Sequence, residues 1–353
     1  MPGGKRIRVL VADGSVVERE RMIASLLTDP DIDVVGEVAH GTAVVESAKR
    51  CRPDVIALGI HIPAGGGFEA TKEIMIEAPT PVVIVSDDGD ARQVQASILA
   101  LRAGALAVVG RPLPAHNGEL VSAVDRFVST VKGMAQVKVV RRWRDAAPVR
   151  VPPAAYAALT LREQPQIIAI AASTGGPAAL QRVLAELPAD FQAPILVVQH
   201  IAGGFVEGLV TWLNAVCSLK VKAAVHGEPI LSHMVYVAPD GSHLGVSGRS
   251  RILLSQQEPI GGFRPSASFL FESVAKGFGA SSMHVILTGM GQDGVSGLRL
   301  ARAAGARIVA QDEASSIVFG MPGAAVEAGV VDAVVPLTSV AGELMAAVRE
   351  RNS

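Results

Sequence analysis

The feature that most constrains the fold is a repeated alternation of short apolar runs with amphipathic segments. Between residues 7 and 131, runs such as IRVLVA, DVIALGI and PVVIVS alternate with helix-like segments such as VVERERMIASLLT. Strands that are apolar throughout are buried on both faces, as in parallel sheets whose crossover helices cover both sides. Residues 5–131 are therefore expected to form a doubly wound α/β domain of flavodoxin-like type, with a five-stranded parallel sheet.

A second alternation follows after a segment without periodicity. Residues 132–165 are rich in arginine and proline and are interpreted as an interdomain linker, with a basic docking strip as the alternative. Residues 166–350 are expected to form a second α/β domain with a mostly parallel sheet. Its short runs VYVAP, HLGVS and RILLS indicate either a mixed sheet or an inserted hairpin.

Length and composition limit the classes of protein and partner. A chain of 353 residues fits two domains of ordinary size. Its 32 Lys and Arg nearly balance its 33 Asp and Glu, so no overall field favours nucleic acid or an anionic membrane. No apolar stretch reaches the roughly 18 residues of a membrane span, so membrane insertion is not expected. Cys51 and Cys217 lack the spacing of a disulfide framework or metal site, which favours a reducing cytoplasm.

Three polar residues follow predicted strands of the second domain. Ser173 and Thr174 come between IIAIAA and a Gly-Gly-Pro turn, His200 ends PILVVQH, and Asp293 lies in the loop GMGQDG. Because loops converge at the carboxyl ends of parallel strands, these residues could supply a nucleophile, a general base and an orienting carboxylate.

Each of these residues also has a structural explanation. A serine before such a turn is often a helix N-cap, a histidine at a strand end is often structural, and GQDG forms a good turn. Ala171 stands where the GxSxG elbow of α/β-hydrolases requires glycine. A phosphate-binding loop is the competing interpretation of the glycines, but neither a Walker lysine nor a GxGxxG pattern is present.

The second domain also contains a series of longer segments: IAIAASTGGPAAL, VVQHI, VYVAPDGSHL, RPSASFLFESVA, VILTGMGQDGVSGL and AQDEASSIVFGMPGAA. In this order they resemble the catalytic domain of the chemotaxis protein-glutamate methylesterases, the CheB family. The resemblance implies a triad of Ser173, His200 and Asp293, with Thr174 and Met290 close to the reacting carbonyl and its oxyanion.

The same resemblance implies the reaction and the partners. It implies hydrolysis of glutamate γ-methyl esters on methyl-accepting chemoreceptors, with deamidation of receptor glutamines as an additional activity and no cofactor. Arg264 is expected at the edge of the substrate groove, unless it only braces its turn. The remaining histidines of the domain are expected to be structural or surface residues: His226, His233, His243 and His284.

The first domain resembles response-regulator receivers but departs from their pattern. A receiver needs an acidic pair for Mg²⁺, an aspartate phosphoacceptor, a hydroxyl and a lysine at successive strand ends. Only Asp13 remains of the acidic pair, Gly59 stands at the phosphoacceptor position, Ser86 keeps the hydroxyl, and Arg111 replaces the lysine. The sequence therefore predicts a pseudo-receiver with no phosphoacceptor.

Neighbouring carboxylates do not readily restore the missing chemistry. Asp54 lies at the opposite end of the third strand, and one carboxylate is a poor Mg²⁺ site even if Asp87 or Asp88 adds a ligand. No metal site is therefore expected, although Arg111 could hold some other anion. A receptor-coupled histidine kinase is a further expected partner by resemblance.

The leading hypothesis is a receptor methylesterase without control by aspartyl phosphorylation. Two alternatives remain open: a chemosensory scaffold or adaptor without turnover, and a serine esterase that acts on another substrate. Three intact triad residues argue against the scaffold, because a binding module has no need of them.

Overall fold

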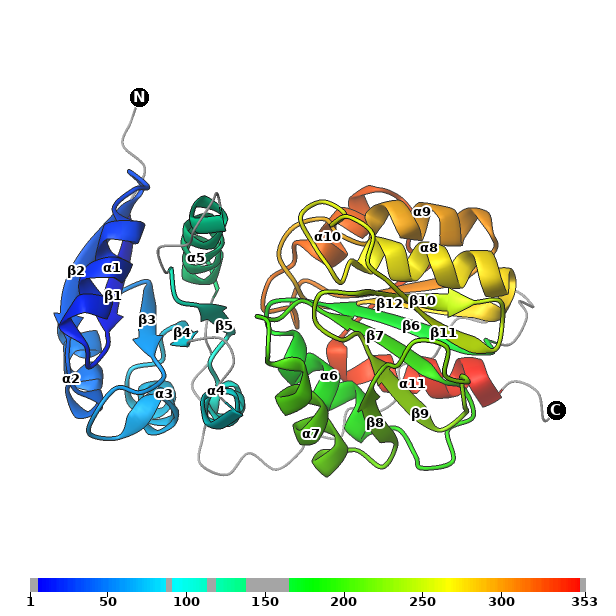
Figure 1. Cartoon of the computed structure of the whole chain (residues 1–353), viewed down its shortest axis with the longest axis horizontal. Helices are drawn as coiled ribbons and strands as arrows, with labels where there is room; N and C mark the ends of the chain where they lie inside the picture. The colour runs from blue at the N-terminus through cyan, green and yellow to red at the C-terminus, as the bar shows by residue number, and fades with distance from the viewer. Residues whose placement is uncertain (1–5, 87–90, 113–118, 138–164, 350–353) are drawn as a thin grey trace. The chain divides into compact units, whose positions relative to one another are not determined.

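The computed structural model describes residues 6–86, 91–112, 119–137 and 165–349, which form two compact units (Figure 1). Most of the predicted linker, together with Asp87 and Asp88, lies outside the described residues. Helix α5 (Glu119–Ala135) continues past the predicted boundary at residue 131. The boundaries 5–131, 132–165 and 166–350 stay predictions.

The N-terminal unit is built on a five-stranded parallel sheet in the order β2-β1-β3-β4-β5. Helices α1 and α5 lie on one face and α2, α3 and α4 on the other (Figure 1). This order is that of flavodoxin-like folds, so the predicted fold class is confirmed. The strands are β1 (Ile7–Ala12), β2 (Ile32–Val38), β3 (Val55–Gly59), β4 (Val82–Ser86) and β5 (Ala107–Gly110). The other helices are α1 (Val16–Leu26), α2 (Gly41–Cys51), α3 (Gly66–Glu77) and α4 (Ala91–Ala103).

The C-terminal unit has a seven-stranded sheet in the order β14-β13-β12-β6-β7-β9-β8, and its strand pairs are all parallel. The antiparallel pair β10 (His243–Ser247) and β11 (Arg251–Ser255) forms a separate hairpin, so the inserted hairpin is the correct one of the two predicted arrangements. The strands of the main sheet are β6 (Ile167–Ala172), β7 (Ile195–Gln199), β8 (Lys220–Ala223), β9 (Met234–Val237), β12 (Ser282–Ile286), β13 (Arg307–Gln311) and β14 (Ala333–Val335).

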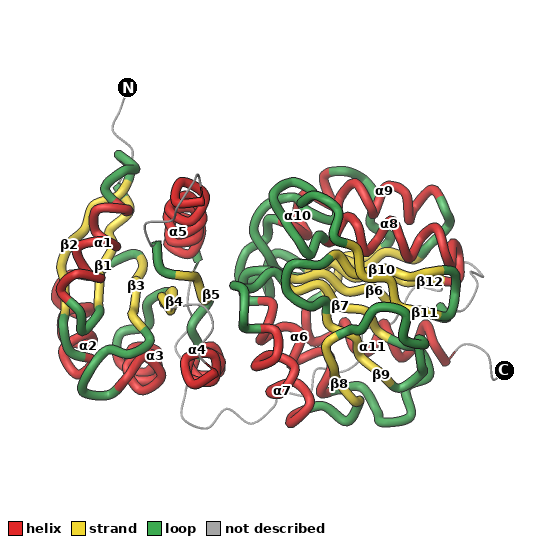
Figure 2. The backbone as a smooth tube through the Cα atoms, viewed as in Figure 1, coloured by secondary structure: helices red, strands yellow, loops and turns green. Residues whose placement is uncertain are grey.

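Helices cover both faces of this sheet, which explains why its central strands are apolar throughout. Helices α8, α9 and α10 lie on one face, and α6, α7 and α11 lie on the other (Figures 1 and 2). Strands β6, β7 and β12 are buried at every position. The helices are α6 (Gly176–Ala185), α7 (Val206–Val216), α8 (Ala267–Phe278), α9 (Val295–Ala303), α10 (Met321–Glu327) and α11 (Leu337–Arg349), with a 3₁₀ turn at Gly279–Ser281.

The strand order positions the predicted site. The chain moves from β6 to β7 on one side of the sheet, whereas β12 pairs with β6 on the other side. Connections therefore diverge at the carboxyl end of β6, which is where open α/β sheets place their ligand and catalytic groups. Among the described residues, no helix has the length and apolar character needed to cross a membrane.

Candidate active site

Ser173 and His200 follow directly paired residues of neighbouring strands. Ala172 of β6 is the register partner of Gln199 of β7, and the backbone N–H of His200 donates to the Ala172 carbonyl at 3.0 Å. The Gln199 side chain donates to the Ser173 and His200 carbonyls, each at 2.8 Å. One buried amide therefore ties the backbone of both residues.

Two glycines allow the turn after Ser173. Gly175 has φ +74°, a left-handed conformation that favours glycine, and it precedes helix α6. A β-carbon on Gly176 would overlap the Gln199 amide oxygen. The Gly-Gly pair thus permits both the turn and the close approach of the Gln199 side chain.

The loop after β12 lies against Ser173. The Ser173 N–H donates to the Thr288 carbonyl at 3.0 Å, and the Thr288 hydroxyl donates to the Thr174 carbonyl at 3.0 Å. A β-carbon on Gly289 would stand 2.7 Å from the Ser173 β-carbon, a distance that side chains do not tolerate. Gly289 thus packs directly against Ser173, and Met290 is the next residue in the chain.

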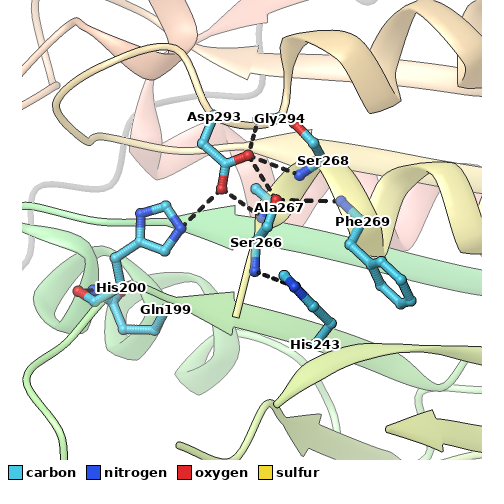
Figure 3. Close-up of polar contacts among 9 residues, drawn as sticks. All are labelled: Gln199, His200, His243, Ser266, Ala267, Ser268, Phe269, Asp293 and Gly294. Carbon is cyan, nitrogen blue, oxygen red and sulfur yellow. Dashed lines mark hydrogen bonds and ion pairs between the residues drawn. The ribbon is translucent and has the colours of Figure 1, made fainter. Parts of the chain in front are cut away.

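Asp293 contacts the imidazole of His200 from the same loop. Its Oδ2 lies 3.0 Å from His200 Nε2, and both side chains are buried (Figure 3). An ionised carboxylate only accepts hydrogen bonds, so Nε2 carries a proton, and in the neutral ring the lone pair is then on Nδ1. Within the described residues, this buried Nδ1 has no hydrogen-bond partner. Ser173 Oγ makes no hydrogen bond to His200 Nδ1 among the described residues. Hydrogen bonds between a nucleophile and its base often form or tighten only when substrate binds.

The charge on Asp293 is stabilised by its surroundings. Burial alone raises its pKa, but the hydrogen bond and charge of His200, with hydrogen bonds from Ser268 and the Ala267 N–H, lower the pKa to about 2. The carboxylate also accepts from the N–H of Gly294 at 2.8 Å. Asp293 is therefore ionised across the physiological range.

The His200 ring is also held by stacking. Phe263 packs against it with ring centroids 4.2 Å apart and an interplanar angle of 10°. The neighbouring Arg264 donates to the carbonyls of Gln256 and Gln257 at 3.3 and 3.2 Å. Arg264 thus braces its turn, and its predicted role at the substrate groove stays a prediction.

Two backbone donors next to Ser173 are available to an anion. The N–H groups of Thr174 and Met290 donate no hydrogen bond within the described residues. Unpaired N–H groups beside a nucleophile are suited to stabilise an oxyanion. The oxyanion role of Thr174 and Met290 stays a prediction.

Sequence reasoning missed several groups that support Asp293. Helix α8 begins against this carboxylate: the Ser266 hydroxyl donates to Oδ1 at 2.9 Å, the Ala267 N–H to Oδ2 at 2.7 Å and the Ser268 N–H to Oδ1 at 3.0 Å. A serine before a helical pattern is an N-cap signal, but nothing in the sequence shows that Asp293 shares this helix end.

The four histidines expected to be structural or surface residues lie at both kinds of position. His226 and His233 are exposed, and His226 accepts a hydrogen bond from the Leu254 N–H. His284 is buried beside Ser282, and His243 is buried.

The polar residues of the N-terminal unit also meet at strand ends. A β-carbon on Gly59 would overlap Asp13 Oδ2, so the aspartate carboxylate lies over the position of the expected phosphoacceptor. Arg111 Nη1 lies 3.2 Å from Asp13 Oδ2 and 3.2 Å from Glu18 Oε2. Asp13 Oδ1 accepts from the Ser15 N–H at 2.8 Å. The sequence did not indicate that Glu18 of helix α1 joins this cluster.

This cluster does not fit the Mg²⁺ ion that receivers of this fold employ. Its strand-end carboxylate, Asp13, is held by the Arg111 guanidinium, whose side chain is only 8% exposed. A cation beside that oxygen would meet a buried positive charge. The described residues also contain no group of three or more His, Cys, Asp or Glu side chains arranged to hold a metal.

Ser86, the hydroxyl residue that the sequence identifies after the fourth strand, is buried at the end of β4.

Comparison with known proteins defines the class of the chain. Residues 9–125 match the response regulator receiver domain, and residues 168–344 match the CheB methylesterase family. The chain is thus a response regulator in which a receiver domain precedes an enzyme domain. It belongs to the CheB methylesterase family.

Relatives match over nearly the full length. A protein-glutamate methylesterase/protein-glutamine glutaminase 4 of Myxococcus xanthus is 50% identical over 97% of both chains. The Rhizobium meliloti protein-glutamate methylesterase/protein-glutamine glutaminase of group 3 operon is 43% identical over 98% of both chains. Among solved structures, the Thermotoga maritima CheB methylesterase catalytic domain is 35% identical, with a TM-score of 0.51 over 52% of this chain and 98% of that domain.

Proposed function

We propose that this chain is a cytoplasmic protein-glutamate methylesterase and protein-glutamine glutaminase that acts on methyl-accepting chemoreceptors, with Ser173 as nucleophile. The observation that carries this proposal is the state of His200. Asp293 Oδ2 holds Nε2 at 3.0 Å, which leaves Nδ1, buried and without a hydrogen-bond partner among the described residues, as the nitrogen that can act as a base. The names of the full-length relatives support the substrate class.

His200 is the general base of the proposed reaction. Its Nδ1 takes the proton of Ser173 Oγ as that oxygen attacks the ester carbonyl, and the imidazolium is stabilised by the ionised Asp293. The N–H groups of Thr174 and Met290 stabilise the oxyanion. His200 then gives the proton to departing methoxide, which leaves as methanol.

Water completes the cycle. His200 deprotonates a water molecule that attacks the acyl-serine, Ser173 Oγ recovers the proton, and the glutamate side chain is released. With a glutamine substrate the leaving group is ammonia, and the remaining steps are the same. Both activities therefore use one set of residues.

Methanol release from methylated chemoreceptor tests the proposal. We expect Ser173→Ala to lower turnover by about four to six orders of magnitude, because the members of a triad act as a unit. Ser247→Ala, at an exposed position of the same unit, is the matched control and should leave turnover unchanged. Hydrolysis of small p-nitrophenyl esters alone would favour a different esterase, and no turnover on either substrate would favour a scaffold.

We further propose that the receiver domain works without aspartyl phosphorylation. Gly59 has no group to phosphorylate, and the Asp13 carboxylate over it is engaged by Arg111 and the Ser15 N–H. A histidine kinase bound to the receptors then remains a binding partner rather than a phosphate donor to this domain.

A further inference from the structure

A hydrogen-bond chain runs from a buried histidine outside the triad to the carboxylate of Asp293 (Figure 3). His243 of strand β10 is fully buried and contacts Ser266, which caps helix α8 and contacts Asp293. We infer that His243 and Ser266 are positioning residues for His200 and act on it through Asp293. This inference rests on the proposed function of Ser173, His200 and Asp293.

Ser266 uses both hydrogen-bonding capacities of its hydroxyl. The hydroxyl donates to Asp293 Oδ1 at 2.9 Å and accepts from the Phe269 N–H at 3.4 Å as the N-cap of helix α8. Because an ionised carboxylate cannot donate, the hydroxyl proton must point to Asp293. The cap therefore fixes the direction of the donor as well as the start of the helix.

His243 fixes the backbone of Ser266. Its Nδ1 accepts from the Ser266 N–H at 3.2 Å, so the ring proton is on Nε2, which donates to the Glu258 carbonyl at 3.2 Å. Phe269 stacks on the ring with centroids 4.8 Å apart. A neutral imidazole of one tautomer thus connects the hairpin strand β10 to the residue that holds Asp293.

The position of Asp293 determines which face of His200 is free. Oδ2 accepts from His200 Nε2 and from the Ala267 N–H, whereas Oδ1 accepts from the Ser266 hydroxyl and the Ser268 and Gly294 N–H groups. The carboxylate is thereby held from both oxygens. Loss of the Ser266 hydroxyl removes the one side-chain donor to Oδ1 among these contacts and leaves the backbone N–H groups, so the carboxylate is held less tightly and the His200 ring bonded to Oδ2 is aligned less well.

Ordinary helix capping would give a different result from positioning. A cap that only stabilises α8 changes the unfolding midpoint, whereas a positioning residue also changes the reactivity of Ser173. Among the described residues, no hydrogen bond, ion pair or ring contact joins His243 to Asp293 or His200, and Ser266 is the hydrogen-bonded link between them.

The test is the rate at which Ser173 of the full chain reacts with a fluorophosphonate probe, measured together with kcat and KM for methanol release. We expect Ser266→Ala and His243→Phe each to slow probe labelling and kcat about tenfold, with KM within about twofold. Ser266→Thr keeps the hydroxyl, and His243→Asn places an acceptor near Nδ1. Both should recover most of the rate.

Asp293→Ala provides the decisive background. If Ser266 and His243 act through Asp293, neither substitution slows the reaction further once that carboxylate is absent. Full effects that persist in Asp293→Ala, or conservative variants no better than Ala and Phe, would overturn the inference.

The two levels of the proposal fail differently. A wild-type chain that does not react with the probe would overturn the proposed nucleophile and the inference with it. A reactive wild type with unaffected variants would overturn the inference alone. If His243→Phe does not fold, Ser266→Ala and Ser266→Thr are compared in the wild-type and Asp293→Ala backgrounds, and that comparison tests the inference.

Discussion

At the scale of single residues, the candidate active site depends on positions where no side chain fits. A β-carbon on Gly289 would lie 2.5 Å from Met321 Sδ and 2.7 Å from the Ser173 β-carbon. We expect Gly289→Ala to displace Ser173 or the Met290 N–H and to lower kcat about ten- to a hundredfold, because small misplacements of catalytic groups are costly. Esterase kinetics and circular dichroism check this, and a folded variant with unchanged kcat would contradict it.

Asp293 links the site to acid stability. Its pKa is lowered to about 2 in the folded chain, below the ordinary 3.8. The folded state therefore binds fewer protons than the unfolded state in this range, so the stabilisation is complete above about pH 4 and is lost as the pH falls toward 2. Urea unfolding should show wild type losing about 1 kcal/mol relative to Asp293→Asn between about pH 6 and pH 3. An unchanged difference would mean that Asp293 is not stabilised as a charge.

At the scale of elements, apolar runs identify strands but not their neighbours. The run IIAIAA becomes β6, and HLGVS and RILLS become β10 and β11. The sequence left open whether those two join the main sheet, because pairing depends on the twist and packing of distant elements. Ser173, His200 and Asp293 could be proposed from the sequence because they follow strands whose ends converge. Ser266 and His243 could not, because their link to Asp293 exists only once α8 packs beside β12.

The strand ends of the receiver are joined by charge. Arg111 after β5 pairs with Asp13 after β1 and Glu18 in α1, and the three side chains are largely buried. Arg111→Met removes the cation between two buried carboxylates, and we expect it to destabilise the N-terminal unit by about 3 kcal/mol. Calorimetry of the full chain checks this, with Lys49→Met, which breaks an exposed pair with Glu46 and Glu77, as control. Equal, negligible effects would show that the Arg111 cluster does not stabilise the fold.

At the scale of the whole molecule, the two domains differ in how much of their chemistry remains. The enzyme domain brings Ser173, His200 and Asp293, the proposed nucleophile, base and orienting carboxylate, to neighbouring strand ends. The receiver domain keeps the fold but fills the corresponding strand ends with an internal ion cluster. Under the proposal that this domain is not phosphorylated, control of methylesterase activity by it would come from binding.

Acetyl phosphate tests that conclusion on the intact chain. With Mg²⁺ and radiolabelled acetyl phosphate, we expect no base-labile label and no change in methanol release, because Gly59 offers no acceptor and both Asp13 oxygens are engaged. Asp13→Asn is the control that locates any label. A label that this substitution abolishes, accompanied by a faster reaction at Ser173, would show that Asp13 has taken over the phosphoacceptor role and that the Arg111 pair opens to allow it.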